Sequence, residues 1–268
     1  MPLDYLSELE NNSIFIIREA YRRIKNVAML WSMGKDSTTL LWLIRKAFLG
    51  NVPFPVIHID TGYKFSEIYE FRDKFAAEWG LNLVIARNLT AINNNVGPQG
   101  LKFDCCNRLK TEALKLAIEQ YNLQGLYLAI RRDEHGIRAK ERAFSSRTSD
   151  FMWDYLGQPM EIWSQYNTRL REKEHIRIHP MLAWREIDVW EYIRKENLPV
   201  VPLYFAKGKK RYRSIGCSCC CNPVTSKAGN LNSIIKELIK AKVSERSGRA
   251  QDKESAYTMQ KLRALGYM

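Results

Sequence analysis

Short apolar runs alternate with longer amphipathic segments along most of the chain. The apolar runs have the length of strands that are buried on both faces of a sheet. The amphipathic segments repeat apolar residues every three or four positions, which is the period of a helix. We predict strands over 27–31, 54–59, 81–86, 126–130 and 176–178, and helices over 3–25, 38–48, 65–79, 105–121, 186–196, 230–243 and 255–265.

Strands that alternate with helices predict an α/β fold with an open parallel sheet and helices on both faces. Two polar segments, 88–101 and 135–172, interrupt the alternation and are predicted to be irregular. Pro199 ends the helix predicted over 186–196. We therefore expect a main domain over residues 1–200 and a cysteine-rich helical extension over 201–268 that packs on it.

The most informative stretch joins the first predicted strand to the helix that follows it. Between them lies the polar turn Ser32-Met33-Gly34-Lys35-Asp36-Ser37. Such a turn directs backbone N–H groups at one point, and the helix N-terminus adds about half a positive charge. Gly34 lets the backbone approach an anion, and Lys35 adds a mobile positive charge. The turn predicts a phosphate site, although an ordinary capped strand-to-helix turn would contain the same residue types.

This turn resembles the pyrophosphate-binding loop, S-x-G-x-D-S, of the ATP pyrophosphatases, which cleave ATP between its α and β phosphates. The resemblance implies the PP-loop, or adenine nucleotide alpha hydrolase-like, fold for residues 1–200. The residues that it implies for holding the pyrophosphate of ATP are Ser32, Gly34, Lys35, Ser37 and Thr38. Asp36 would fix the loop or a Mg²⁺-bound water, and Asp60 and Thr61 would line the nucleotide from the next strand.

Further motifs match one family, and together with the turn they extend over almost the whole chain. They lie at 58–65, 131–134, 138–142, 184–190 and 244–249. These motifs resemble the small subunit of sulfate adenylyltransferase and its phosphoadenylylsulfate reductase relatives. The residues for which we predict catalytic roles on this basis are Lys35, Asp36, Arg131 and Arg132.

The two arginines would stabilise charge on the phosphates or on the acceptor. The alternative for them is a surface salt-bridge network with Asp133 and Glu134, which would contribute little energy. His58 lies inside an apolar strand, so we interpret it as a packed core histidine rather than a catalyst.

Six cysteines fall into two clusters, Cys105-Cys106 and Cys217-Ser218-Cys219-Cys220-Cys221. In a cytoplasmic chain, clustered cysteines indicate metal or redox chemistry rather than structural disulfides. The pattern made by Cys105, Cys106, Cys217 and Cys220 is similar to the four thiolates that hold a [4Fe–4S] cluster in adenylylsulfate reductases. Zinc or a set of spare thiols would fit the same pattern, and Cys219 and Cys221 permit other pairings.

The cysteines also guide the functional prediction. No cysteine follows Cys221, so the nucleophile in the C-terminal tail of the reductases has no counterpart. An ATP-cleaving loop beside an iron–sulfur type of cysteine set resembles the ATP pyrophosphatase of DNA phosphorothioation systems of the Dnd and Ssp type. We therefore expect adenylylation of DNA, with ATP and Mg²⁺ as cofactors and a cysteine desulfurase as sulfur donor. The alternatives are a sulfate adenylyltransferase small subunit, which needs a large GTPase subunit, or a reductase-like protein.

The composition agrees with a polyanionic ligand. Lys and Arg number 42 against 29 Asp and Glu, which gives a formal charge of +13. Such a charge favours nucleic acid, nucleotides or an acidic partner, although solubility alone would also explain it. The run at 207–213 carries five basic residues, and we predict that it contacts nucleic acid; a solvated loop or an acidic partner is the alternative.

The apolar runs are too short to span a membrane, and no signal peptide is recognisable at the N-terminus. We therefore expect a cytoplasmic protein, and a homo-oligomer is compatible with the sequence.

Overall fold

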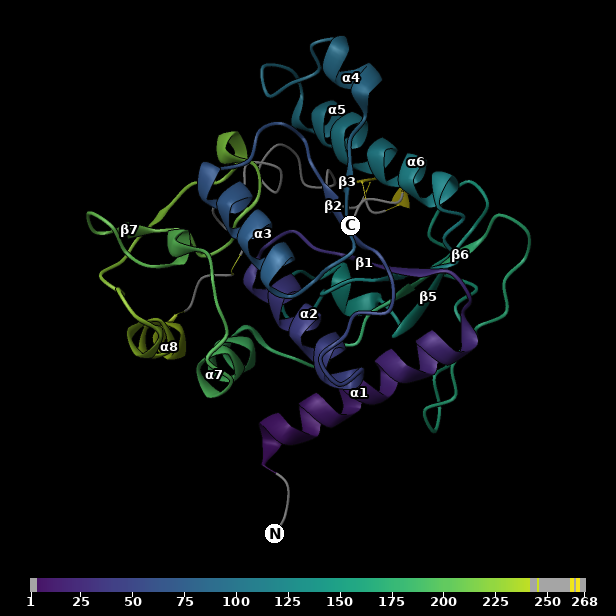
Figure 1. The fold of residues 1–268 in the computed structure, drawn as a ribbon, viewed down its shortest axis with the longest axis horizontal. Coiled ribbons are helices and arrows are strands. Elements are labelled where there is room, and N and C mark those ends of the chain that lie inside the picture. Colours follow the sequence, from purple (N-terminus) through teal and green to yellow (C-terminus); the bar gives the residue numbers. More distant parts are fainter. Residues whose placement is uncertain (1–3, 242–244, 246–260, 263, 266–268) are drawn as a thin grey trace.

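Six strands form the central sheet, in the order β3-β2-β1-β4-β6-β5 (Figure 1). Five of them are parallel, and β5 pairs with β6 in the antiparallel sense. The computed structural model describes residues 4–241, 245, 261–262 and 264–265. The strands of this sheet are β1 (Val27–Leu30), β2 (Val56–Ile59), β3 (Leu83–Ala86), β4 (Gly125–Tyr127), β5 (Phe144–Arg147) and β6 (His175–Ile178).

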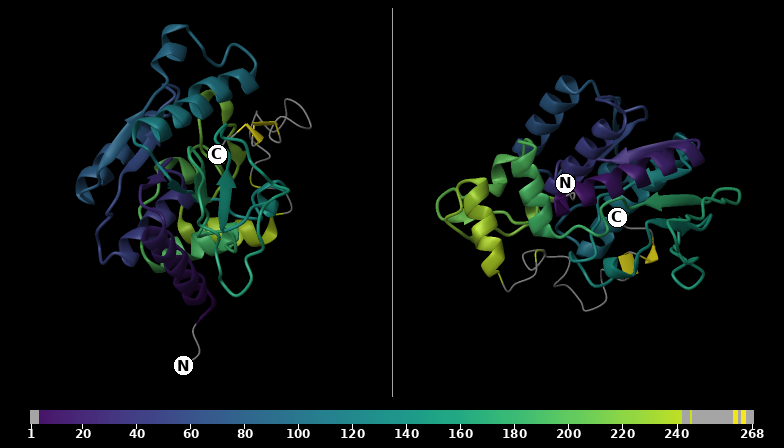
Figure 2. Two further views of the ribbon diagram at one scale, coloured as in Figure 1. Left: turned by 90° about the vertical axis from the view of Figure 1, so that its right-hand side faces the viewer. Right: turned by 90° about the horizontal axis from the view of Figure 1, so that it is seen from below.

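Helices connect these strands and cover the sheet. They are α1 (Tyr5–Arg23), α2 (Lys35–Ala47), α3 (Ser66–Glu78), α4 (Leu89–Asn93), α5 (Lys102–Cys106), the π-helical η1 (Asn107–Thr111), α6 (Glu112–Gln120), the 3₁₀ turn η2 (Arg138–Lys140), α7 (Glu186–Lys195) and α8 (Leu231–Lys240). The last region adds two 3₁₀ turns, η3 (Pro202–Tyr204) and η4 (Ser218–Cys220), and a small hairpin of β7 (Lys210–Arg211) and β8 (Val224–Thr225). Helices α7 and α8 lie side by side at one end of the molecule (Figure 2).

The strand order places a crevice at the middle of the sheet. The chain runs outward from β1 through β2 to β3 and then returns past β1 to β4. Because parallel crossovers are right-handed, α2 and α3 lie on one face of the sheet and α6 lies on the other. Ligands of open α/β sheets bind where the strand order reverses, at the carboxyl ends of the strands. Here that point lies between β1 and β4, and the turn at 32–37 leaves β1 beside it.

The predicted α/β class with a mostly parallel sheet is confirmed, and three local predictions were wrong. The segment 135–172 contains strand β5, whose sequence Phe-Ser-Ser-Arg has no long apolar run. The predicted loop at 88–101 begins with helix α4. Instead of the single helix predicted over 105–121, the chain forms two α-helices, α5 and α6, which the π-helical η1 separates.

Two further predictions concern the C-terminal region. The helix expected near 255–265 lies largely outside the described residues. The boundary after residue 200 stays a prediction; Tyr204, Ile234 and Ile235 of the expected extension are buried in the same hydrophobic core as the strands. Among the described helices, none is long and apolar enough to cross a membrane.

Gly125 allows β4 to pack tightly against its neighbours. A Cβ atom at this position would lie 3.0 Å from Val27 Cγ1 and 3.1 Å from both Ile178 Cδ1 and Ile24 Cγ2. We predict that Gly125→Ala lowers the free energy of unfolding by about 1–3 kcal/mol, the usual cost of overpacking. The measurement is urea unfolding, with Gly136→Ala as the control because no atom lies within 4 Å of a Cβ there. Equal losses in the two variants would show that the neighbours of β4 move aside.

His58 of β2 is buried, as its apolar surroundings predict. Its Nδ1 lies 3.1 Å from the carbonyl oxygen of Trp31, which can only accept, so we assign the proton to Nδ1. Burial, reinforced by the charge of Lys64, lowers the pKa of His58 from 6.5 to about 4.

This pKa makes stability depend on pH in a defined window. Between pH 6.5 and 4 the unfolded chain binds a proton at His58 that the folded chain does not, so stability falls as the pH falls. We predict a contribution of about 3 kcal/mol over this window. Urea unfolding at several pH values should show a shallower dependence in His58→Gln than in the wild type. Identical slopes would contradict a neutral buried His58.

Candidate nucleotide site

The turn between β1 and α2 takes its shape from Met33 rather than from Gly34. Met33 is buried and has φ of +59°, in the left-handed region that side chains rarely adopt. Gly34 has φ of −68° and ψ of 158°, an extended conformation that any residue can adopt. A Cβ at Gly34 would make ordinary van der Waals contacts, at 3.4 Å from Ser32 Oγ and 3.5 Å from Tyr204 Oη. The unusual backbone conformation of the turn therefore lies at Met33.

Hydroxyl groups close the turn. Ser37 Oγ accepts a hydrogen bond from the Ser32 backbone N–H at 3.2 Å and donates one to the Gly34 carbonyl at 3.1 Å. Tyr204, from η3, accepts a hydrogen bond from the backbone N–H of Lys35 at 2.8 Å. The N-terminal end of α2 favours anions, and one of its backbone N–H groups is here bound to the neutral hydroxyl group of Tyr204.

A cleft opens beside this turn at the carboxyl ends of β1, β2 and β4, the place that the strand order predicts. Five of the predicted site residues line it, namely Ser32, Gly34, Lys35, Asp36 and Ser37. Residues that the sequence analysis did not assign to the site also line it, namely Lys64, Lys110, Glu134, Arg138, Tyr204 and Glu245. The cleft therefore combines the polar turn with charged side chains from distant parts of the chain.

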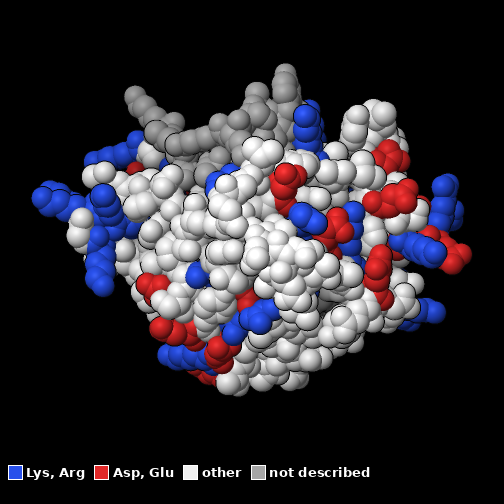
Figure 3. Space-filling model, turned by 90° about the horizontal axis from the view of Figure 1, so that it is seen from above, with Lys and Arg blue, Asp and Glu red and all other residues white. Residues whose placement is uncertain are grey.

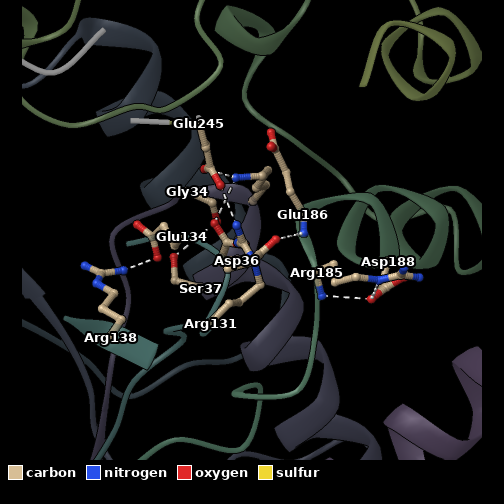
Figure 4. A network of polar contacts seen from close by, with 12 residues as sticks. Gly34, Asp36, Ser37, Arg131, Glu134, Arg138, Arg185, Glu186, Asp188 and Glu245 are labelled. Carbon is tan, nitrogen blue, oxygen red and sulfur yellow. Dashed lines mark hydrogen bonds and ion pairs between the residues drawn. The ribbon is translucent and has the colours of Figure 1, made fainter. Parts of the chain in front are cut away.

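An ion cluster adjoins the cleft, and three of its members, Lys35, Asp36 and Glu245, line it (Figure 4). Lys35 Nζ contacts Asp36 at 3.0 Å and also binds the carboxylate of Glu245. The guanidinium of Arg131 binds Asp36, Glu245 and, at 3.0 Å, Asp133. The cluster thus joins the start of α2, the segment after β4 and a residue close to the C-terminus.

Electrostatics hold the cluster ionised. Burial alone would raise the pKa of Glu245, but Lys35 and Arg131 outweigh it and hold the pKa at about 2. Burial likewise disfavours the charged form of Arg131, yet the surrounding carboxylates, Glu245 first, raise its pKa above the ordinary value. Removing one member of such a buried network leaves the others uncompensated, which is costly.

The remaining predicted site residues lie away from the cleft lining. Thr38 is buried and accepts a hydrogen bond from Trp31 Nε1 at 3.2 Å. Asp60 accepts hydrogen bonds from Gly62 N–H and Arg87 Nε, both at 2.9 Å. Burial raises the pKa of Asp60, but these partners outweigh it and lower the pKa.

Arg132 is exposed, whereas its neighbour Arg131 is fully buried. The surface-network alternative therefore does not describe Arg131, whose carboxylate partners include Asp36 and Glu245. Catalytic and binding roles for all of these residues stay predictions.

The cysteines gather beside the cleft without forming a metal site among the described residues. Thr61 Oγ1 lies 3.3 Å from Cys217 Sγ, and Cys219 Sγ lies 3.7 Å from Cys220 Sγ. Burial, followed by neighbouring cysteines, raises the pKa of Cys105 to about 11 and that of Cys220 to about 12.

These pKa values are those of metal-free thiols, and a bound metal ion would itself convert its thiol ligands to thiolates. No group of three or more cysteine, histidine or acidic side chains in the described part of the chain is arranged to hold a metal ion. As arranged here, the cysteines do not fit a [4Fe–4S] cluster or zinc, and a cluster on Cys105, Cys106, Cys217 and Cys220 remains a prediction.

The basic run at 207–213 does not form a continuous basic surface. Arg211 is buried and contacts Glu237 at 2.7 Å, and Arg213 contacts Glu186 at 2.7 Å. Of the five basic residues in the run, only the three lysines are exposed. On the face shown in Figure 3, basic side chains gather at one edge and elsewhere alternate with acidic ones. The arginines of the run therefore form ion pairs with carboxylates of the protein itself, and its lysines contribute surface charge.

Some of the cleft residues that the sequence analysis did not assign to the site lie within motifs that it did identify. Glu245 and Arg138 belong to the motifs at 244–249 and 138–142, although nothing local indicated that they reach the turn. The other residues of the motif at 244–249 lie outside the described part of the chain. Tyr204 had no signal, because an aromatic residue after a proline most often serves packing.

Comparison with known proteins identifies the family. The profile of the phosphoadenosine phosphosulfate reductase domain matches residues 26–223. Sulfate adenylyltransferase subunit 2 of Geotalea daltonii is 39% identical, over 99% of this chain and 98% of the relative. The protein of the same name from Rhizobium meliloti is 40% identical, over 99% of this chain and 94% of the relative.

Solved structures show the same fold at low identity. A phosphoadenylyl-sulfate reductase from Candida auris superposes with a TM-score of 0.54 and 16% identity, covering 84% of this chain and 98% of that one. An FMN adenylyltransferase from Candida glabrata gives a TM-score of 0.56 and 15% identity, covering 98% of this chain and 84% of that one. At such identities the likeness concerns the fold alone.

These relatives correct the function expected from the sequence. The prediction of DNA phosphorothioation was wrong, because the relatives that match almost the whole chain are named sulfate adenylyltransferase subunit 2. Neither a DNA substrate nor a cysteine desulfurase finds support among them. The motif resemblance is confirmed in its broader form, and the chain belongs to the phosphoadenosine phosphosulfate reductase domain family, with sulfate adenylyltransferase subunit 2 proteins as full-length relatives.

Proposed function

We propose that this chain transfers the adenylyl group of ATP to sulfate, as the nucleotide-binding subunit of a sulfate adenylyltransferase. The observation that carries the proposal is the placement of the turn at 32–37 beside a cleft at the topological switch point, in a chain whose relatives bear that name. The fold supports nucleotide binding there, because phosphate groups favour helix N-termini at the carboxyl edge of such sheets.

The proposed reaction forms one bond and breaks another at the α-phosphorus. A sulfate oxygen attacks this phosphorus, and the bond to the bridging oxygen breaks, so that pyrophosphate leaves with the bonding electrons. The products are adenylylsulfate and pyrophosphate. Positioning and neutralisation of charge provide most of the catalysis in reactions of this kind.

The residues of the turn suit the departing pyrophosphate. Lys35 lies at the first position of α2 and would neutralise charge on the β and γ phosphates. Ser32 and Ser37 present hydroxyl groups at the same turn, 3.1 Å apart. Mg²⁺ accompanies ATP in most such enzymes, where phosphate oxygens and water supply most of its ligands and it neutralises the phosphate charge.

The name of the relatives also indicates an assembly. A protein called subunit 2 works with another subunit, so we propose that this chain has an unlike partner. Purification of the tagged chain from its own cells would recover that partner together with it.

The proposed reaction is most easily tested in reverse, because a phosphate–sulfate anhydride is a high-energy product. We predict that the complex recovered with the tagged chain makes ATP from adenylylsulfate and pyrophosphate, measured by luciferase luminescence. The control omits pyrophosphate. A complex that binds ATP but makes none from adenylylsulfate would contradict sulfate as the acceptor.

Lys35 provides the test of the turn itself. We predict that Lys35→Ala lowers the rate of this reaction at least 100-fold, which corresponds to about 2.7 kcal/mol of lost transition-state stabilisation. The matched control is Lys46→Ala on the same helix, whose side chain pairs with Glu10 and Glu196 away from the cleft. Circular dichroism should show that both variants are folded. Equal rates in the two variants would remove Lys35 from the proposed site.

A further inference from the structure

The ion cluster on the cleft wall carries the wrong net charge for a site that receives phosphates. Its two cations, Lys35 and Arg131, face three carboxylates, Asp36, Asp133 and Glu245, so the cluster sums to one negative charge. ATP carries several negative charges of its own. Of the three carboxylates only Glu245 is buried, and its charge repels such a ligand at the position between the two cations, because charge interactions are strong where water is excluded.

Carboxylates also surround the side chain of Arg131. Each of its three guanidinium nitrogens already binds a carboxylate: Nε binds Asp133, Nη1 binds Asp36 and Nη2 binds Glu245. Because a guanidinium has five N–H donors, two remain, one on Nη1 and one on Nη2, but Arg131 is fully buried behind these carboxylates. Departure of the carboxylate that separates Arg131 from the cleft would let both cations face ATP.

Glu245 is the carboxylate best placed to leave. Asp36 lies in the first turn of α2, and Asp133 also accepts the backbone N–H of Glu186 at 2.7 Å, at the start of α7. Among the described residues, by contrast, the Glu245 carboxylate binds only Lys35 and Arg131. Glu245 also lines the cleft, so its carboxylate already borders the space that a ligand would enter.

A carboxylate in this position resembles part of a phosphate group. Both groups present acceptor oxygens to charged donors, and lysine and arginine bind either one through charge-assisted hydrogen bonds. The shared position between Lys35 Nζ and Arg131 Nη2 can hold only one of them at a time.

We propose that Glu245 is an internal anion that occupies the phosphate position of the empty cleft, and that polyphosphate must displace it to bind. The proposal rests on the proposed function for the identity of the ligand, and it adds a self-inhibitory contact to that site. Displacing Glu245 leaves two cations against two carboxylates, so the cluster becomes neutral before phosphate enters.

Self-inhibition of this kind weakens apparent affinity by a calculable factor. The apparent dissociation constant equals the intrinsic one divided by the fraction of molecules in which the position is free. If Glu245 occupies the position nine times in ten, removing its charge strengthens binding roughly tenfold.

The experiment measures the binding of pyrophosphate and of α,β-methylene ATP by isothermal titration calorimetry. Glu245→Gln should bind both ligands roughly tenfold more tightly than the wild type, and Glu245→Asp, which keeps the charge on a shorter side chain, should fall between them. The matched control is Glu237→Gln, because Glu237 pairs with Arg211 and does not line the cleft. The control should bind like the wild type.

Other outcomes overturn the proposal. Equal or weaker binding by Glu245→Gln would mean that Glu245 positions the two cations rather than competing with the ligand. If Glu245→Gln does not fold, Glu245→Asp decides, and binding no tighter than that of the wild type overturns the proposal. A wild type that binds neither ligand would instead refute the proposed function, so the two failures are distinguishable.

Discussion

The position of two buried cations beside the N-terminus of α2 is the constraint on which the site depends. Lys35 and Arg131 come from the first and the fourth strand connections, and they meet only because β1 and β4 are neighbours in the sheet. Their charges can remain buried because Asp36, Asp133 and Glu245 compensate them. The strand order therefore sets the location of the site, and the carboxylates determine its state of charge.

Much of this arrangement could be predicted from local patterns, because the strands near the site are short apolar runs and α2 has a regular helical period. The turn was found for the same reason, since its polar residues interrupt two apolar segments. Strand β5 was missed because an edge strand with polar residues lacks that signal. The ion pair between Lys35 and Glu245 joins residues 210 positions apart, and no local pattern can report such a contact. Likewise, the inward direction of Arg211 and Arg213 depends on carboxylates supplied by α8 and α7.

The error about the acceptor has a chemical origin. The turn at 32–37 reports where ATP would be cleaved, and that step is shared by enzymes that adenylylate very different acceptors. The cysteines and the basic run then shifted the prediction towards DNA. Both arginines of the run are held in ion pairs with carboxylates of the same chain. Overall similarity along the chain was the better guide to the family.

The central claim is that the cleft between β1 and β4 binds ATP with its phosphates between the turn and the two buried cations. An experimental structure of the chain with α,β-methylene ATP and Mg²⁺ tests this most directly. We expect the β and γ phosphates within hydrogen-bonding distance of Lys35 Nζ and of the backbone at 34–37, with the α-phosphorus open to the cleft. Phosphates bound elsewhere, with the turn at 32–37 unchanged and empty, would contradict the account.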